Sequence, residues 1–115
     1  MDTRSDARRV VVVEYRCRVT ATPVDAGPHE ETALGATCTP SPALAASWLR
    51  AQASLLVWRL EPGSAASAQL MAWRDDETEQ RMAAGALVAG QPVRFRVLDS
   101  EITYELSATR VIRKP

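Results

Sequence analysis

The segment from Pro92 to Ile112 constrains the fold more than any other part of the chain. On both sides of an expected two-residue turn at Asp99-Ser100, apolar residues alternate with polar ones. Successive side chains of a strand point to opposite faces of a sheet, so this alternation predicts an antiparallel hairpin with one apolar face. The apolar face comprises Val93, Phe95, Val97, Ile102, Tyr104 and Leu106, and the polar face comprises Arg94, Arg96, Thr103 and Glu105. The predicted register places Phe95 opposite Tyr104 and Arg94 opposite Glu105.

A second alternating pattern runs through residues 11–22, and a shorter one follows at Leu34, Ala36 and Cys38. The turn-forming run Asp25-Ala26-Gly27-Pro28 separates the two patterns, which predicts another hairpin. Its predicted register places Cys17 opposite Cys38 on the inward face. We expect both cysteines to be buried because they lie on the inward face. We expect them to remain unbonded thiols because the protein is expected to be cytoplasmic, where thiols stay reduced.

Helix signals occupy the middle of the chain. Ser41-Pro42 predicts a helix start, with Leu44, Trp48, Ala51 and Leu55 following at helical spacing. This helix could run to Leu60 and stop at Glu61-Pro62-Gly63, or it could end near Gln52. The bulky and β-branched content of residues 54–60, SLLVWRL, favours a strand there.

Two further elements are predicted after residue 60. Residues 68–73, AQLMAW, would pair with residues 54–60 in a middle hairpin. Asp75 or Asp76 could then cap a short helix with Glu77 and Glu79 in its first turn.

These patterns predict an α+β, mostly β fold of about six antiparallel strands with one or two short helices, forming a small barrel or sandwich. With 115 residues the chain can bury one core without disulfides or metals. We expect residues 1–115 to form a single domain in which residues 1–8 are a flexible N-terminal tail.

The charge balance limits the partners. The chain has 14 basic and 14 acidic residues and a formal net charge of zero, so no overall attraction to nucleic acid or an anionic membrane is expected. Residues 1–9 lack the apolar run of a secretory signal, and Val10 to Val13 is too short to span a bilayer. We therefore expect a cytoplasmic protein that does not enter membranes.

Residue types that carry catalysis or bind metals are sparse. His29, the only histidine, lies beside Glu30 and Glu31 in a loop, as is typical of an exposed loop. Its spacing from Cys17 and Cys38 fits no closed zinc site. The sequence has no phosphate-binding glycine loop and no nucleophile elbow. We predict no metal, no cofactor and no enzymatic activity.

Five arginines are predicted to share one polar sheet face. They are Arg16, Arg18, Arg94, Arg96 and Arg110. Residues 87–97, LVAGQPVRFRV, also resemble the L..GQ.V.F.V pattern near the end of cold-shock domains and other small barrels. The resemblance implies a small barrel that binds single-stranded nucleic acid.

Aromatic side chains argue against this alternative. Binders of single strands stack bases on surface aromatic residues. Tyr15, Phe95 and Tyr104 are all expected on the apolar side of their strands. Nucleic-acid binding through the arginine face is therefore the second hypothesis, after protein binding.

Residues 54–60 favour a protein partner, because a strand there would carry apolar side chains on both faces. The core of a small domain needs only one such face, so the other is available to a partner or a second subunit. The candidate interface residues are Leu56, Trp58 and Leu60. The sequence thus predicts a non-enzymatic protein–protein interaction or assembly module. Such a protein could be a structural component of a phage particle or secretion apparatus, or an inhibitor or immunity-type partner.

Overall fold

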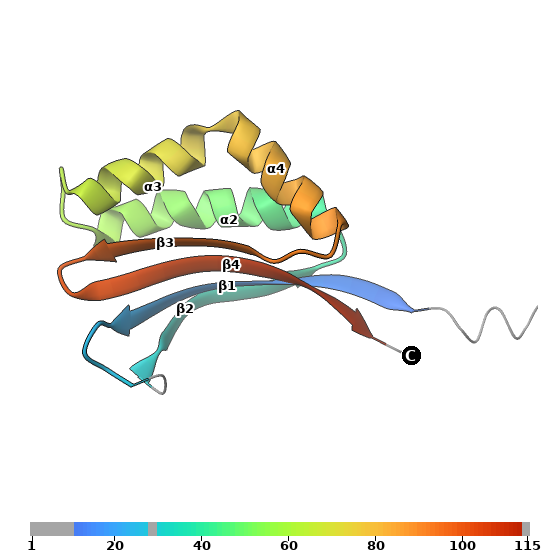
Figure 1. Cartoon of the computed structure of the whole chain (residues 1–115), viewed down its shortest axis with the longest axis horizontal. Coiled ribbons are helices and arrows are strands. Elements are labelled where there is room, and N and C mark those ends of the chain that lie inside the picture. Colours follow the sequence, from blue (N-terminus) through green and yellow to red (C-terminus); the bar gives the residue numbers. More distant parts are fainter. Residues whose placement is uncertain (1–10, 28–29, 114–115) are drawn as a thin grey trace, which may run out of the picture.

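A computed structural model of the protein describes residues 11–27 and 30–113. In chain order the elements are strands β1 (Val12–Pro23) and β2 (Thr32–Thr39), helix α2 (Pro42–Leu56), the 3-10 turn η2 (Val57–Arg59), helices α3 (Ala65–Asp75) and α4 (Glu77–Val88), and strands β3 (Val93–Asp99) and β4 (Ile102–Arg113) (Figure 1).

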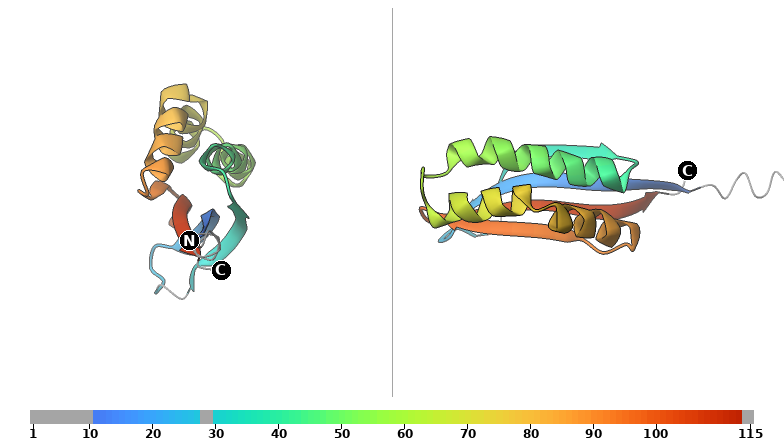
Figure 2. Two further views of the ribbon diagram at one scale, coloured as in Figure 1. Left: turned by 90° about the vertical axis from the view of Figure 1, so that its right-hand side faces the viewer. Right: turned by 90° about the horizontal axis from the view of Figure 1, so that it is seen from above.

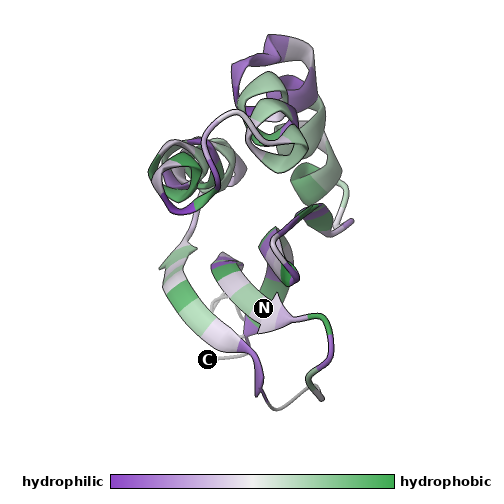
Figure 3. Ribbon diagram, turned by 90° about the vertical axis from the view of Figure 1, so that its left-hand side faces the viewer, coloured by the Kyte–Doolittle hydropathy of each residue, from purple (hydrophilic) through white to green (hydrophobic). Residues whose placement is uncertain are grey.

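The four strands form one antiparallel sheet in the order β2-β1-β4-β3. All three helices lie on one face of this sheet, and no element of the described chain packs on the other, which we call the open face (Figures 2 and 3). The sheet therefore ends at β2 on one side and at β3 on the other. The expected barrel or sandwich of about six strands is wrong, because the segments expected as the middle hairpin are helical.

The core lies between the sheet and the helices. The largest fully buried side chains are Leu49, Leu70, Leu87, Leu106 and Cys17. The C-terminal hairpin presents its apolar face to the helices, as its alternation predicts, with Val97, Tyr104 and Leu106 buried. The α+β class is confirmed, with a larger helical share than expected.

The register of the β3–β4 hairpin differs from the predicted one by two residues. Ser100 and Glu101 have φ angles of 48° and 68° and form the two-residue turn, as hairpin turns of this kind require positive φ at both central positions. Asp99 stays in the strand, where its carboxylate accepts a hydrogen bond from the Glu61 amide at 2.9 Å. Arg96 therefore faces Glu105, and Phe95 faces Leu106. An even shift leaves every side chain on its predicted face.

The register of the β1–β2 hairpin differs by one residue from the predicted one around Cys17. An odd shift moves the opposing β2 side chains to the other face of the sheet. Cys17 faces Thr37, and Cys38 faces Arg16. An irregularity lies at Val19 and Thr20, which face Gly35 and Ala33 and leave Leu34 unpaired. Cys17 is therefore buried beneath the helices while Cys38 is exposed, and both are free thiols. The expectation of two buried cysteines is wrong for Cys38.

The two thiols should differ strongly in reactivity. Burial, with a smaller contribution from Cys38, raises the pKa of Cys17 from 9.0 to about 11, so its thiolate is about 100-fold scarcer at neutral pH than in an ordinary cysteine. We expect a thiol reagent to modify Cys38 rapidly in the native protein and Cys17 only after unfolding. In Cys38→Ser the native protein should stay unmodified, and rapid labelling of that variant would show that Cys17 is accessible.

Helix α2 begins as predicted but ends later. The Ser41 hydroxyl accepts a hydrogen bond from the Leu44 amide at 3.2 Å, and Pro42 is the first helical residue. The helix continues to Leu56 and passes into η2, so residues 54–60 do not form the predicted strand. The segment is helical because this conformation buries Ala53, Leu56 and Leu60 together, which outweighs the β-propensity of its residues.

Helices α3 and α4 also have clear local causes. Residues 68–73 lie within α3, which buries Ala66, Leu70 and Trp73 at helical spacing instead of forming a strand. The Asp76 carboxylate accepts a hydrogen bond from the Glu79 amide at 3.1 Å and caps α4, as predicted. None of the helices in the described ranges is long and apolar enough to cross a membrane.

Candidate functional site

The three predicted interface residues are separated by the helical conformation of their segment. Leu56 and Leu60 are 3% and 4% exposed and belong to the core. Trp58 is 87% exposed, the largest exposed fraction among the large apolar side chains. Of the three, Trp58 alone is thus available to a partner, because a helical turn directs Leu56 and Leu60 toward the sheet.

Trp58 continues a second apolar face of α2, which we call the outer stripe. The outer stripe comprises Leu44, Trp48, Ala51, Leu55 and Trp58, at successive spacings of four, three, four and three residues. This is the heptad spacing of helices that pack against another helix. Leu44 and Leu55 are 59% and 62% exposed, Ala51 is exposed, and Trp48 is half-buried.

The core face of α2 is made of other residues. The residues of α2 that are buried in the central core cluster are Ala45, Leu49, Ala53 and Leu56. Four of the five residues of the outer stripe appear in the sequence at helical spacing. This pattern is easily mistaken for the core face, because the true core face is rich in alanine.

The outer stripe adjoins the edge strand β2. A Cβ atom on Gly35 would lie 3.2 Å from Oε1 of Gln52 and 3.7 Å from the Trp48 ring, so the glycine allows α2 to lie close to β2. A small hollow of about 140 Å³ between the two elements is lined by residues that include Leu34, Gln52 and Leu55. Figure 2 shows α2 over the β2 side of the sheet and α3 and α4 over the β3 side. We call the outer stripe together with β2 the α2–β2 face.

The two edges of the sheet carry different charges. Strand β2, with the sequence TALGATCT, has no charged residue and no proline. Strand β3 carries Arg94, Arg96 and Asp99. Charged residues on an edge strand oppose its pairing with another chain. The β3 edge has this protection. The β2 edge has no charged residue to oppose a further strand, although its pairing with β1 is irregular at Leu34.

Four of the five predicted arginines lie on the open face. Arg18 and Arg94 both face Ser107 of β4 from opposite sides, Arg16 faces Thr109, and Arg96 faces Glu105. Arg110 lies on the helix-covered face instead, where it faces Tyr15 and donates a hydrogen bond from Nη1 to the Val88 carbonyl at 3.1 Å. The pairing of β4 with β1 continues without a shift to Arg113, so Arg110 stays on the same face as Leu106 and Ala108.

The open face has features that weaken it as an anion site. Arg18 pairs with Glu31 at 2.7 Å, and Arg96 pairs with Glu105 at 2.5 Å. Tyr15 and Tyr104 are buried beneath the helices. Phe95 stacks on Trp73 with ring centroids 4.9 Å apart. Half of the arginine charge is therefore balanced, and these three aromatic rings are directed toward the helices.

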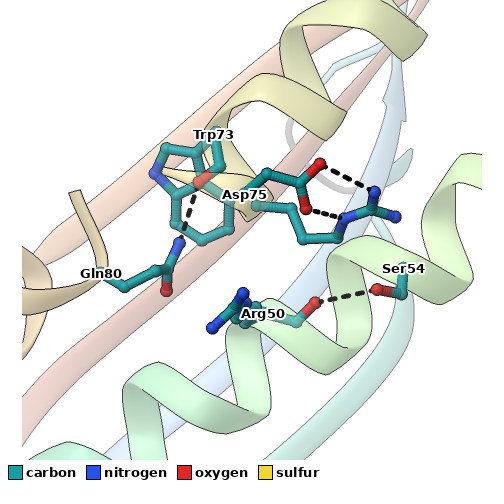
Figure 4. A network of polar contacts seen from close by, with 6 residues as sticks. Arg50, Ser54, Trp73, Asp75 and Gln80 are labelled. Atoms are coloured by element: carbon teal, nitrogen blue, oxygen red, sulfur yellow. Dashed lines mark hydrogen bonds and ion pairs between the residues drawn. The ribbon is translucent and has the colours of Figure 1, made fainter. Parts of the chain in front are cut away.

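A polar network at the junction of α3 and α4 has a structural role (Figure 4). Arg74 donates hydrogen bonds at 2.8 and 3.1 Å to the two carboxylate oxygens of Asp75. This contact, assisted by the charge of Arg50, lowers the pKa of Asp75, so the carboxylate remains ionised at neutral pH. The Gln80 side-chain amide donates to the Trp73 carbonyl at 3.0 Å, which satisfies an acceptor at the end of α3.

Potential metal ligands do not cluster within residues 11–27 and 30–113. These ranges contain no group of three or more His, Cys, Asp or Glu side chains that could hold a metal ion. The raised pKa of Cys17 makes it a poor nucleophile. His29, the only histidine of the sequence, lies outside the described residues.

The chain matches no protein-family model, no curated protein sequence and no solved structure. The function is therefore inferred from the exposed residues of this protein alone. Within the described chain, the α2–β2 face combines a highly exposed tryptophan, a heptad-spaced apolar stripe and an uncharged sheet edge.

Proposed function

We propose that the protein is a non-enzymatic interaction module that binds another polypeptide through the α2–β2 face. The observation that carries this proposal is the 87% exposure of Trp58 at the end of the outer stripe. Tryptophan is enriched among the residues that dominate binding energy at protein interfaces. An apolar stripe along a helix and an open strand edge are two common means of recognising a polypeptide, and this face offers both.

The α2–β2 face is also suited to binding because it is held rigidly. The opposite side of α2 is anchored in the core by Leu49, Ala53 and Leu56. The outer stripe thus keeps its geometry before a partner arrives, which reduces the entropy lost on association. Structural components of a phage particle or secretion apparatus, and inhibitor or immunity-type proteins, are the classes we propose for such a module.

Replacing Trp58 by Ser should weaken binding about 10-fold or more, since truncating a central aromatic anchor commonly costs more than 1 kcal/mol. The melting temperature should change little, because the side chain is almost fully exposed. Self-association is measured by sedimentation velocity, and other partners by quantitative mass spectrometry of polypeptides retained from the native host. Met82→Ser is the matched control, since Met82 is 61% exposed on α4, outside this face.

Two results would count against this assignment. If Trp58→Ser and Met82→Ser retain the same polypeptides equally, the outer stripe does not bind them. If Trp58→Ser unfolds the protein, Trp58 has a structural role that its exposure does not indicate.

Anion binding by the open face is a second candidate function, supported by the row in which Arg18, Ser107 and Arg94 lie side by side on three strands. If the protein binds single-stranded nucleic acid there, the affinity for a labelled oligonucleotide should fall steeply with salt. The double variant Arg16→Ala/Arg94→Ala should reduce both the affinity and its salt dependence. Absence of binding at every salt concentration would exclude this candidate.

A further inference from the structure

We infer that the polypeptide bound by the α2–β2 face is a second copy of this chain, related to the first by a two-fold axis. The two β2 strands would pair antiparallel and join the sheets into one sheet of eight strands. The two α2 helices would pack along their outer stripes on the same side of that sheet. This inference rests on the proposed function and names its partner.

The first argument is that two copies of the α2–β2 face can meet without bringing like charges together. A two-fold interface brings the same patch of both copies together, so any charge near its centre meets its own kind. No charged residue lies between Thr32 and Thr39, and the outer stripe has none. Arg59 lines the hollow beside Leu55, eight residues along the chain from Ala51 and so away from the centre of the face. The β3 edge would instead bring arginines of one copy close to those of the other. A self-pairing edge must therefore be β2.

The second argument is that the outer stripe is symmetric about its smallest member. In an antiparallel pair of α2 helices centred at Ala51, the two alanines meet at the axis. Trp48 then lies beside Leu55 of the other copy, and Leu44 lies beside Trp58 of the other copy. Small residues at the centre allow the helix axes to approach to about 8–10 Å, and large residues fill the space on either side.

The third argument is that a single two-fold axis can relate both the two β2 strands and the two α2 helices. Gly35 is near the middle of β2. The space where its Cβ would be is bounded by Trp48 and Gln52, the residues on either side of Ala51 along α2. The centre of the strand and the centre of the stripe are therefore at the same level of the molecule. Pairing of the strands and packing of the helices can occur in a single docked arrangement.

The α2–β2 face is large enough for a specific dimer. A helix of 15 residues and a strand of 8 residues are about 22 and 27 Å long. With a depth of about 20 Å for one helix layer on one strand layer, the two copies would together bury on the order of 1,000 Å². This area meets the minimum of about 1,000 Å² expected of a biological interface.

The test uses opposite charges at the proposed axis. Ala51 is exposed in one copy, so Ala51→Arg and Ala51→Glu should both remain folded by circular dichroism. Sedimentation velocity should show the wild-type protein as a dimer, and each variant alone should dissociate about 10-fold or more readily, because like charges meet at the axis. An equimolar mixture of the two variants should dimerise again. Met82→Arg, with the same charge placed outside the face, should remain a dimer.

Restored dimerisation in the mixture would support the two-fold contact at Ala51, because charges remote from the axis would neither repel in the single variants nor attract in the mixture. Hydrogen exchange should also show that amides of Thr32–Thr39 are protected in the dimer and lose protection in Ala51→Arg. If either substitution unfolds the chain, Leu44→Arg and Trp58→Glu provide the corresponding test, since both side chains are exposed and Leu44 lies beside Trp58 of the other copy. Each variant alone places a charge in an apolar contact, and only the mixture brings opposite charges together.

Two results would overturn the inference: a wild-type monomer at the highest concentration reached, or a dimer that tolerates both charges in isolation. A wild-type monomer that still retains another polypeptide in a Trp58-dependent manner would leave the proposed function intact and replace only the partner. A monomer that retains no polypeptide would remove both.

Discussion

Leu106→Ala is expected to lower the free energy of unfolding by about 3–5 kcal/mol, near the upper end of the range for buried leucines. Leu106 is completely buried in the central strand β4. It faces Val19 of β1 on one side and Phe95 of β3 on the other. The cavity left by the alanine would be enclosed by two paired strands and the helices above them, which cannot collapse without distorting the sheet.

The same substitution at Leu98 is the matched control. Leu98 belongs to the same hairpin but lies on the open face and is 60% exposed, so Leu98→Ala should cost less than about 1 kcal/mol. The midpoints of denaturant unfolding give both losses of stability, provided that the slope of the transition is the same in each variant. A larger loss at Leu98 than at Leu106 would mean that the hairpin presents its other face to the helices, and equal losses would contradict the difference in burial.

Trp73→Ala is expected to cost about 3–5 kcal/mol. Trp73 is 9% exposed at the end of α3, and its ring stacks on Phe95 of the edge strand β3. Its removal therefore opens the contact between the helical layer and that edge. The measurement is again the denaturant midpoint, accompanied by near-ultraviolet circular dichroism to follow the packing of the remaining rings.

A double-mutant cycle separates the stacking contact from general loss of volume. Trp73 and Phe95 should show a coupling energy of about 0.5–1.5 kcal/mol. Trp73 and Leu98 lie on opposite sides of the sheet, and their substitutions should be additive within about 0.5 kcal/mol. Additivity of the Trp73 and Phe95 substitutions would contradict the stacked geometry.

The features that could be predicted from the sequence are those fixed within a few residues. The face assignment of the C-terminal hairpin follows from period-two alternation, which an even shift in register cannot change. The starts of α2 and α4 follow from Ser41-Pro42 and Asp76, where a side-chain oxygen accepts a hydrogen bond from an amide of the first turn. Such interactions do not depend on the rest of the fold.

Features fixed by distant contacts could not be predicted. Residues 54–60 are rich in residues that favour strands, and residues 68–73 form an apolar run that could pair with them. Residues 54–59 and 68–73 are nevertheless helical, because the sheet buries Leu56, Leu70 and Trp73 from one side only. Helical spacing of those buried residues was present in the sequence. The neighbouring residues do not show whether the strand pattern or the helical pattern of these segments will be buried by the rest of the chain.

The two hairpin registers illustrate the same limit. The irregularity near Leu34 shifts β2 by one residue and moves Cys38 to the open face. It lies beside Gly35, where α2 approaches the strand through Trp48 and Gln52. The Asp99 side chain binds the Glu61 amide, which leaves Ser100 and Glu101 to form the turn. Both contacts join residues far apart in the sequence.

The candidate site could be predicted only in part. Trp58 was expected at a surface because a strand would expose it, and it is exposed because a helical turn directs it outward. Leu44 and Leu55 show helical spacing in the sequence, but they could be assigned to a partner-facing side only after the alanine-rich core face of α2 was known.

The strand order has a consequence for how the protein folds. The central pair of the sheet joins residues 12–23 to residues 102–113, so its formation must close a loop that contains every other element. Pairings this distant in sequence slow folding, because the chain loses entropy before the contacts form. During synthesis, β1 can pair with β2 but has no partner on its other side until β4 has left the ribosome. In that interval β1 carries an exposed edge, and a slowly translated or truncated chain would be prone to aggregate through it.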